Sequence, residues 1–401
     1  MNLAALNHPG FRLYFIGAVA SANALWIFRI LLTWLAWDLS GSASFVGLIA
    51  ALTLAPTIVS GPLFGVLVDR INIRFAAALA GSSMLLTIAM VSLLYYAGLL
   101  NIPVLAVMAG LGGVSSSLHH PVRMSLAPRL VEPQIVSSVV ALIAVNFNTA
   151  RLISPAIAGI IIERLGIQPG LLIAFCLFCP AILLLPFLRP RGLAERASKG
   201  SFFEDLKDGF VWIKQHPHPQ QILLLSALFA VAVRAPSELL PVIADGLYQM
   251  GATGLGQLGS AVGIGALASA MIKALVAARQ DGRLLSASDS LIALLGIIAA
   301  AGLGVHLIWG WALVMAALVG FAATYLGVSM QASMQQQLPD QMRGRVMSLF
   351  VVIAMGATAI GAFVLGWLAE VFSVTSAHAG FSLVAVLGLG LLLIYQQRAR
   401  R

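Results

Sequence analysis

Residues 65–74 read Gly-Val-Leu-Val-Asp-Arg-Ile-Asn-Ile-Arg; they end one long apolar segment, 44 to 68, and lead into another, 75 to 98. Each segment supplies the ~20 apolar residues that a helix needs to cross the hydrocarbon core of a membrane. The polar stretch between them is short and contains one carboxylate and two guanidinium groups. This arrangement predicts two membrane-spanning helices joined by a tight, charged turn at the membrane surface.

Similar apolar segments, separated by short polar breaks, fill the rest of the chain. Of its 401 residues, 60% are hydrophobic and only 9% are charged, whereas soluble domains carry about 25% charged residues. We therefore expect an all-α polytopic membrane protein, because lipid is the solvent that suits such a surface. Twelve transmembrane helices are expected near residues 12 to 38, 44 to 68, 75 to 98, 101 to 122, 135 to 162, 168 to 188, 219 to 240, 254 to 278, 285 to 305, 308 to 330, 341 to 370 and 376 to 396.

The basic residues are distributed unevenly among the predicted loops and termini. Of the 23 Lys and Arg residues, Arg29, Arg151 and Arg234 fall inside spans, and Arg164 alone falls on one side of the membrane. All the others fall on the opposite side. The positive-inside rule then places both termini in the cytoplasm of a bacterial inner-membrane protein. The net charge of +9 reflects this topology, so nucleic-acid binding is not expected.

Residues 189–218 form the longest polar stretch, and their apolar side chains recur at helical spacing. We expect a cytoplasmic linker with an amphipathic helix on the membrane surface, which divides the chain into halves 1–188 and 219–401. The halves are related, because LISPAIAGIIIE (152–163) matches AIGAFVLGWLAE (359–370) at an offset of 207 residues. This duplication predicts two pseudo-symmetric six-helix halves with a binding site at their interface.

Three motifs resemble those of a known family. Residues 65–74 resemble the G-x-x-x-D-R-x-G-R-R loop of the major facilitator superfamily, with Asn72 in place of the loop glycine; Asn tolerates the left-handed backbone expected of the turn. Residues 151–159 are similar to the fifth-helix G-P-x-x-G-G element, and residues 338–348 resemble the P-x-x-x-R-G-R-V-x-S stretch of the enterobactin-exporter-like branch. The resemblance covers nearly the whole chain and implies the major facilitator fold and export coupled to the proton gradient.

The same resemblance implies that some residues outside the solute site control conformational gating. In this superfamily the Asp and Arg of the loop hold the second and third helices against the eleventh and so close the cytoplasmic side. The residues of this chain that match these family elements are Gly65, Asp69, Arg70, Arg74, Pro155, Gly159, Arg343 and Arg345.

Arg29 and Arg234 are the sharpest candidates for solute binding, because a charge at bilayer depth costs at least about 2.5 to 3.5 kcal/mol. They lie 205 residues apart, at repeat-equivalent places on the first and seventh helices, which face each other across the cavity in this superfamily. Glu238 follows Arg234 by four residues, which predicts an ion pair on a regular helix. A proton on Glu238 would then free Arg234 to hold an anion. Against this, Pro236 could break the helix, or the pair could be static and fix helix packing.

Other polar or aromatic span residues are also candidates for solute binding. Arg151 would contact the solute or brace the interface between the halves. Asn23 and Asn146 would contact the solute or form interhelical hydrogen bonds, and Trp26 would stack on an aromatic solute. The expected substrate-binding set is Arg29, Arg234, Glu238, Asn23, Trp26, Asn146 and Arg151, with Glu238 as the proton-coupling group.

The sequence contains no pattern typical of a catalytic, metal or cofactor site. Cys176 and Cys179 stand in an apolar span without further metal ligands, so we interpret them as packing residues. A glycine-rich phosphate-binding motif is absent from the sequence, which argues against ATP-driven transport within this chain.

The sequence therefore predicts a transporter and not an enzyme: a monomeric secondary active transporter that exports a small anionic or polyhydroxylated molecule, such as a siderophore or organic acid, coupled to protons. Its expected partners are the solute, protons and membrane lipids, without a cofactor. Three alternatives stay open, namely a lipid or lysolipid flippase on the same fold, an organic-anion importer, and a transport-inactive membrane sensor or assembly partner.

Overall fold

The computed structural model of the chain describes residues 4–191, 202–276 and 287–399. Within these ranges, the side chains that are not described are those of residues 59–70, 120, 202–206, 274–276, 287–288, 340–341, 343 and 395–399. Helices make up all the regular secondary structure of the described ranges, which contain no strand.

Six long helices form the first group. They are α1 (Pro9–Ser40), α2 (Ala43–Arg70), α3 (Ile73–Tyr96), α4 (Ile102–Leu126), α5 (Val136–Leu165) and α6 (Ile167–Leu183). Short 3-10 turns accompany them at Ala4–Asn7, Ala127–Leu130, Pro133–Ile135 and Leu185–Phe187.

A shorter helix, α7 (Phe202–Gln215), lies in the predicted linker and precedes the second group. The helices of that group are α8 (Pro217–Phe229), α9 (Gly251–Val276), α10 (Ala287–Leu303), α11 (Trp309–Gln337), α12 (Asp340–Val371) and α13 (Val374–Ala399). After α8 the chain continues as three irregular helical segments, which are a π-helix (Ala230–Arg234), a 3-10 turn (Ala235–Glu238) and a second π-helix (Val242–Leu247).

Ten of the described helices are long and apolar enough to cross a membrane, and two shorter apolar segments, Ala43–Ile58 and Asp289–Leu303, accompany them. Their outward faces are apolar: on α3, Phe75, Leu86 and Leu93 are 63%, 63% and 59% exposed. Lipid tails are the surroundings that match such faces. The predicted all-α polytopic membrane fold is thereby confirmed, while the count of twelve spans stays a prediction.

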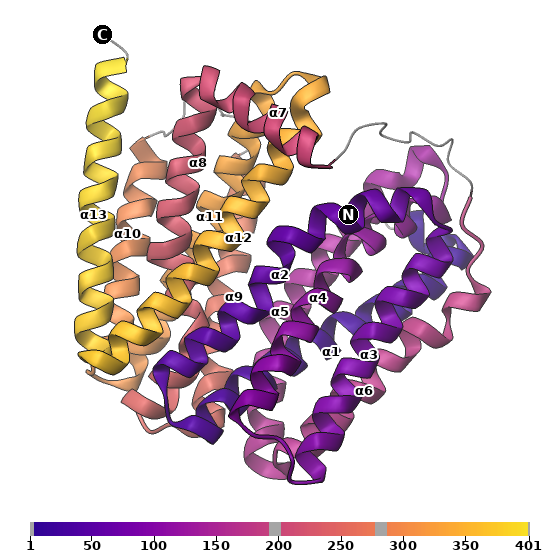
Figure 1. Cartoon of the computed structure of the whole chain (residues 1–401), viewed down its shortest axis with the longest axis horizontal. Helices are drawn as coiled ribbons and strands as arrows, with labels where there is room; N and C mark the ends of the chain where they lie inside the picture. The colour runs from indigo at the N-terminus through magenta and orange to yellow at the C-terminus, as the bar shows by residue number, and fades with distance from the viewer. Residues whose placement is uncertain (1–3, 192–201, 277–286, 400–401) are drawn as a thin grey trace.

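The helices are arranged as two groups, α1 to α6 and α8 to α13, which lie close together at one end and further apart at the end that carries both termini (Figure 1). We call these ends the joined side and the terminus side. Two pairs of helices connect the groups, α2 with α12 and α5 with α9. Each pair joins the second helix of one group to the fifth helix of the other, so the contact between the groups has the pseudo-symmetry that the duplication predicts.

Glycine allows the helices of these pairs to approach closely. An added Cβ at Gly159 on α5 would lie 2.7 Å from the Ala252 carbonyl oxygen of α9. On the other pair, an added Cβ at Gly47 on α2 would lie 2.5 Å from the Ala362 carbonyl oxygen of α12. Both distances are shorter than van der Waals contact, so a side chain at either position would push the two groups apart.

Gly320 on α11 packs against α9 within the second group, where an added Cβ would overlap the Val262 carbonyl group. Gly320→Ala is expected to force the helices apart and to lower the free energy of unfolding by about 1 to 3 kcal/mol. A Cβ added at Gly327 on the same helix has no neighbouring atom within 4 Å. Gly327→Ala is therefore expected to raise the free energy of unfolding by about 0.5 to 1 kcal/mol. Thermal unfolding in detergent, followed by tryptophan fluorescence, measures both, and equal effects would contradict this packing.

The turn between α2 and α3 differs from the prediction at Asn72. Its φ of −58° is not left-handed, so that expectation is wrong. The side-chain oxygen of Asn72 instead accepts a hydrogen bond from the Arg74 N–H at 2.9 Å and caps α3. The residue that stands at the family's glycine position therefore acts as a helix cap, and the turn forms without a left-handed residue there.

Candidate functional site

A cavity of about 100 Å³ lies where the two groups of helices meet. It has room for several water molecules, since about 10 to 15 Å³ is enough for one, but not for a solute of many atoms. Helices α1 and α5 contribute to it from the first group, and α9 and the irregular chain after α8 contribute from the second. The cavity is lined by Trp26, Arg29, Ile30, Thr33, Arg151, Pro155, Ser237, Glu238, Leu240, Pro241, Leu255, Gly259 and Val262.

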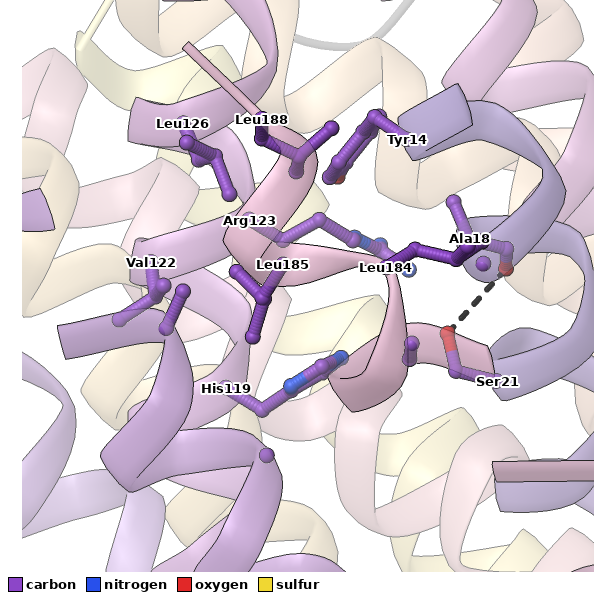
Figure 2. Close-up of a pocket in the computed structure, with 14 residues that line it drawn as sticks. Tyr14, Ala18, Ser21, His119, Val122, Arg123, Leu126, Leu184, Leu185 and Leu188 are labelled. Carbon is purple, nitrogen blue, oxygen red and sulfur yellow. Dashed lines mark hydrogen bonds between the residues drawn. The ribbon is translucent and has the colours of Figure 1, made fainter. Parts of the chain in front are cut away.

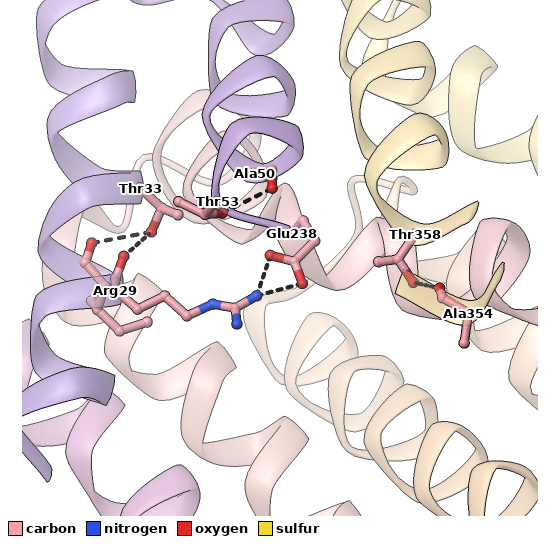
Figure 3. A network of polar contacts seen from close by, with 8 residues as sticks. Arg29, Thr33, Ala50, Thr53, Glu238, Ala354 and Thr358 are labelled. Atoms are coloured by element: carbon pink, nitrogen blue, oxygen red, sulfur yellow. Dashed lines mark hydrogen bonds and ion pairs between the residues drawn. The ribbon is translucent and has the colours of Figure 1, made fainter. Parts of the chain in front are cut away.

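An ion pair between Arg29 and Glu238 crosses this cavity from one group of helices to the other (Figure 3). One terminal nitrogen of Arg29 on α1 donates to both carboxylate oxygens of Glu238, each at 2.6 Å. The side chain of Arg29 is 37% exposed and that of Glu238 is 13% exposed. The hydroxyl of Thr33, one turn away, donates to the Arg29 and Ile30 carbonyls of its own helix. The carboxylate is thus desolvated and bound by a group of the opposite half.

Two further guanidinium groups lie near the pair: Arg151 lines the cavity, whereas Arg234 does not. Arg151 on α5 is close enough to Arg29, Arg234 and Glu238 to interact with all three electrostatically. Among the described residues, Glu238 is the only carboxylate that lines the cavity. Asp245 lies elsewhere and accepts a hydrogen bond from the Trp37 indole N–H at 2.8 Å. Three positive charges against one negative charge make this region suitable for oxygen-rich or anionic groups of a solute.

The irregular chain after α8 decides which arginine pairs with Glu238. Ala230–Arg234 is a π-helix and Ala235–Glu238, which contains Pro236, is a 3-10 turn. Residues 234 and 238 therefore do not have the i, i+4 geometry of a regular α-helix. Glu238 turns toward α1 and pairs with Arg29. The predicted pairing of Glu238 with its sequence neighbour Arg234 is corrected in favour of a contact between the halves.

Trp26 lines the cavity one turn before Arg29 on α1. The guanidinium carbon of Arg29 lies 5.5 Å from the centre of the indole ring, within the range of a cation–π interaction. The other neighbour of this ring is Phe147 of α5, with the two ring centres 5.8 Å apart. Trp26 therefore supports the position of Arg29 and provides an apolar face beside the charged groups.

Asn23 and Asn146 serve contacts between α1 and α5, and neither lines the cavity. The Asn146 amide is buried and donates to the Ala18 carbonyl at 3.0 Å. The Asn23 amide donates to the Val19 carbonyl, and its oxygen accepts from the Ser154 hydroxyl at 2.9 Å. Of the two interpretations for these residues, the geometry corresponds to interhelical hydrogen bonding.

Two carboxylates for which the sequence predicts no role bind the starts of helices across the joined side. Glu370 at the end of α12 accepts from the Ser44 N–H at 2.9 Å and from the Ser42 hydroxyl at 2.5 Å, at the start of α2. Glu163 at the end of α5 accepts from the Thr253 N–H at 3.3 Å, at the start of α9. Helix starts favour negative charge, so both contacts stabilise the joined side. We call them the carboxylate latches.

The predicted gating residues have different surroundings. Pro155 lines the cavity, and Gly159 lies in the close contact of α5 with α9. Arg74 donates to the Leu188 carbonyl at 3.5 Å, within the first group. Arg345 on α12 pairs with Asp208 of α7 at 3.0 Å and so attaches the linker helix to the second group. The side chains of Asp69, Arg70 and Arg343 and the surroundings of Gly65 are outside what the structure describes.

A family model described as transmembrane secretion effector matches residues 1–400 of the chain. The chain belongs to this family of major facilitator transporters. Enterobactin exporter EntS of Shigella boydii serotype 4 (strain Sb227) is 29% identical to this transporter over 410 residues, which cover 100% of the chain and 95% of the relative. Enterobactin exporter EntS of Escherichia coli O157:H7 (strain EC4115 / EHEC) is also 29% identical, with the same coverage. The predicted superfamily and branch are confirmed.

Solved structures of other transporters share the fold of this one. The nucleoside transporter NupG has a TM-score of 0.72 at 11% identity, covering 98% of this chain and 99% of the other. A bacterial homologue of the human lysosomal transporter Spinster, in an inward-facing and unoccupied conformation, has a TM-score of 0.69 at 15% identity, with 96% and 95% covered. The human organic anion transporter MFSD10 (TETRAN) has a TM-score of 0.67 at 17% identity, with 96% and 99% covered. The family is one of membrane transporters, so this protein handles a small-molecule solute.

Proposed function

We propose that this transporter exports a small polyhydroxylated or anionic solute of the siderophore class in exchange for protons, with Glu238 as the coupling group. The observation that carries the proposal is the Arg29–Glu238 ion pair, which joins the two halves inside a cavity that contains Arg151. The names of the relatives, which are enterobactin exporters, support the solute class.

The two signs of charge in the cavity suit such a solute. Guanidinium groups donate to its carbonyl, carboxylate or phenolate oxygens, and Arg151, which lines the cavity, is available for this because it forms no ion pair among the described residues. The Glu238 carboxylate accepts hydrogen bonds from the hydroxyl groups of the solute. The present cavity is too small for a molecule of this kind, so binding requires the halves to separate at the terminus side while the latches hold the joined side.

Proton exchange follows from competition for Glu238. An ionised carboxylate accepts stronger hydrogen bonds from solute hydroxyl groups than a neutral carboxyl group does, so a proton that binds Glu238 weakens solute binding. One proton is taken up as one solute is released. A solute that relied on negative charge alone would behave in the opposite way, because protonation of Glu238 frees Arg29 for the anion, and proton and anion would then move together. The direction of coupling therefore separates the export proposal from the organic-anion importer.

Proteoliposomes containing the purified protein test this proposal. Accumulation of a labelled catecholate siderophore, citrate, a neutral sugar and a quaternary amine is measured with the lumen more acidic, and then more alkaline, than the medium. The proposal expects accumulation of the siderophore only when the lumen is acidic. Accumulation of citrate with an alkaline lumen would indicate the importer instead, and movement of a fluorescent lysolipid without any of these solutes would indicate a flippase.

A further inference from the structure

A second pocket, of about 40 Å³, lies inside the first group of helices and shares no lining residue with the central cavity. Residues of α1, α3, α4 and α6 surround it, together with the turn that follows α6. Its volume corresponds to two or three water molecules or one small ion. Leucine, valine and alanine form most of its wall.

Four polar side chains, those of Tyr14, Ser21, His119 and Arg123, line this otherwise apolar pocket. Arg123 extends from α4 across it toward α1, and Tyr14 of α1 lies beside the guanidinium group (Figure 2). Each residue is only 8% exposed. The Nε of Arg123 and the hydroxyl oxygen of Tyr14 are buried, and neither has a hydrogen-bond partner among the described residues. Buried polar groups normally have a partner, so two unpartnered groups beside one pocket indicate an occupant.

The charge of Arg123 also lacks compensation. None of the described residues that line the pocket is a carboxylate. The guanidinium carbon lies 5.8 Å from the centre of the Phe147 ring, but a cation–π interaction replaces only a part of the lost hydration. Ser21, which also lines the pocket, donates its hydroxyl hydrogen to the Ala18 carbonyl at 3.3 Å. An isolated buried cation is unfavourable without a counter-charge.

We propose that this pocket is a binding site for one small monovalent inorganic anion of the size of chloride, held by the guanidinium group of Arg123 and the hydroxyl group of Tyr14. Both groups donate hydrogen bonds, as an anion requires. The anion neutralises the buried charge and fastens α4 to α1. The volume of the pocket excludes the transported solute and lipid headgroups, so the site is separate from the proposed transport site.

Chloride binding by the purified protein tests this proposal without a transport assay. Thermal unfolding is measured in sodium chloride, nitrate, formate and gluconate at equal ionic strength, and radiolabelled chloride is bound in equilibrium dialysis. Gluconate is too large for the pocket and serves as the reference anion. We expect the midpoint of unfolding to be about 3 °C or more higher in chloride than in gluconate. Tyr14→Phe, which removes one donor, is expected to weaken chloride binding by roughly 10-fold.

Two further variants complete the test. Arg123→Gln removes the charge and is expected to unfold at the same temperature in chloride and gluconate. Arg12→Gln removes an exposed basic residue of the same half and is expected to keep the full chloride effect. Equal chloride effects in the wild type and Arg123→Gln would overturn the proposal, as would equal midpoints of the wild type in chloride and gluconate. If Arg123→Gln does not fold, unchanged chloride affinity in Tyr14→Phe would overturn it.

Discussion

Arg29→Gln and Glu238→Gln are each expected to lower the free energy of unfolding by about 2 kcal/mol, whereas the double variant is expected to recover most of that loss and still transport no solute. Each single substitution leaves the other charged group without its partner in a partly desolvated cavity, and the double substitution removes both charges. Thermal unfolding in detergent and solute accumulation in proteoliposomes measure the two effects separately.

The double variant distinguishes a structural pair from a functional one. If the Arg29–Glu238 pair served only to pack the helices, recovery of stability would bring recovery of transport. Arg164→Gln, an exposed basic residue at the end of α5, is the control and is expected to change neither property. Losses of stability that simply add in the double variant would show that the two side chains are not coupled in solution.

Simultaneous replacement of both latch residues, Glu163→Gln and Glu370→Gln, is expected to shift the protein toward a state that is open at the joined side. Each latch is exposed, so we assign it only about 1 kcal/mol. Two such contacts correspond to a change of roughly 10- to 30-fold in the ratio of closed to open molecules. The substitutions keep the shape of the side chains and remove the charges that favour the starts of α2 and α9.

Spin labels on the joined side measure this opening. Leu99 and Ile308 are exposed there, one in each half, and are suitable for Leu99→Cys and Ile308→Cys after Cys176→Ser and Cys179→Ser. We expect the distance distribution to gain a longer component in the double latch variant. Glu132→Gln, which removes an exposed carboxylate paired with Arg191 inside the first half, is expected to leave the distribution unchanged. A similar response to Glu132→Gln would contradict the role of the latches.

The fold could be predicted from the sequence because its main determinants are local. A membrane requires long apolar segments whatever their neighbours, and ten of the described helices are long and apolar enough to span it. The predicted segment 219 to 240 extends beyond α8 into the π-helix and the 3-10 turn that follow it. The repeat between residues 152–163 and 359–370 likewise indicated the pseudo-symmetry of α5 and α12. It also aligned Glu163 with Glu370, a match that could have suggested the latches, since both are acids at the ends of equivalent spans.

The site could be predicted only in part, because its geometry depends on contacts between distant segments. Their positions inside predicted spans identified Arg29, Arg151 and Glu238 as charges at bilayer depth, and all three line the cavity. The partner of Glu238 was mistaken because i, i+4 spacing has meaning only on a regular helix, and the chain around Pro236 is irregular. Asn146 faces α1 because of how α5 is rotated about its own axis in the bundle. The hydropathy of the segment does not determine this rotation.

The central claim, that Glu238 couples the solute to protons, is tested most directly by comparing two transport modes in the Glu238→Gln variant. Proteoliposomes are assayed for accumulation driven by a pH gradient and for exchange of labelled against unlabelled solute without a gradient. Gln keeps an oxygen that accepts hydrogen bonds but cannot take up the proton. We predict that gradient-driven accumulation is lost while exchange persists. Gradient-driven accumulation at the wild-type level in Glu238→Gln would contradict the claim.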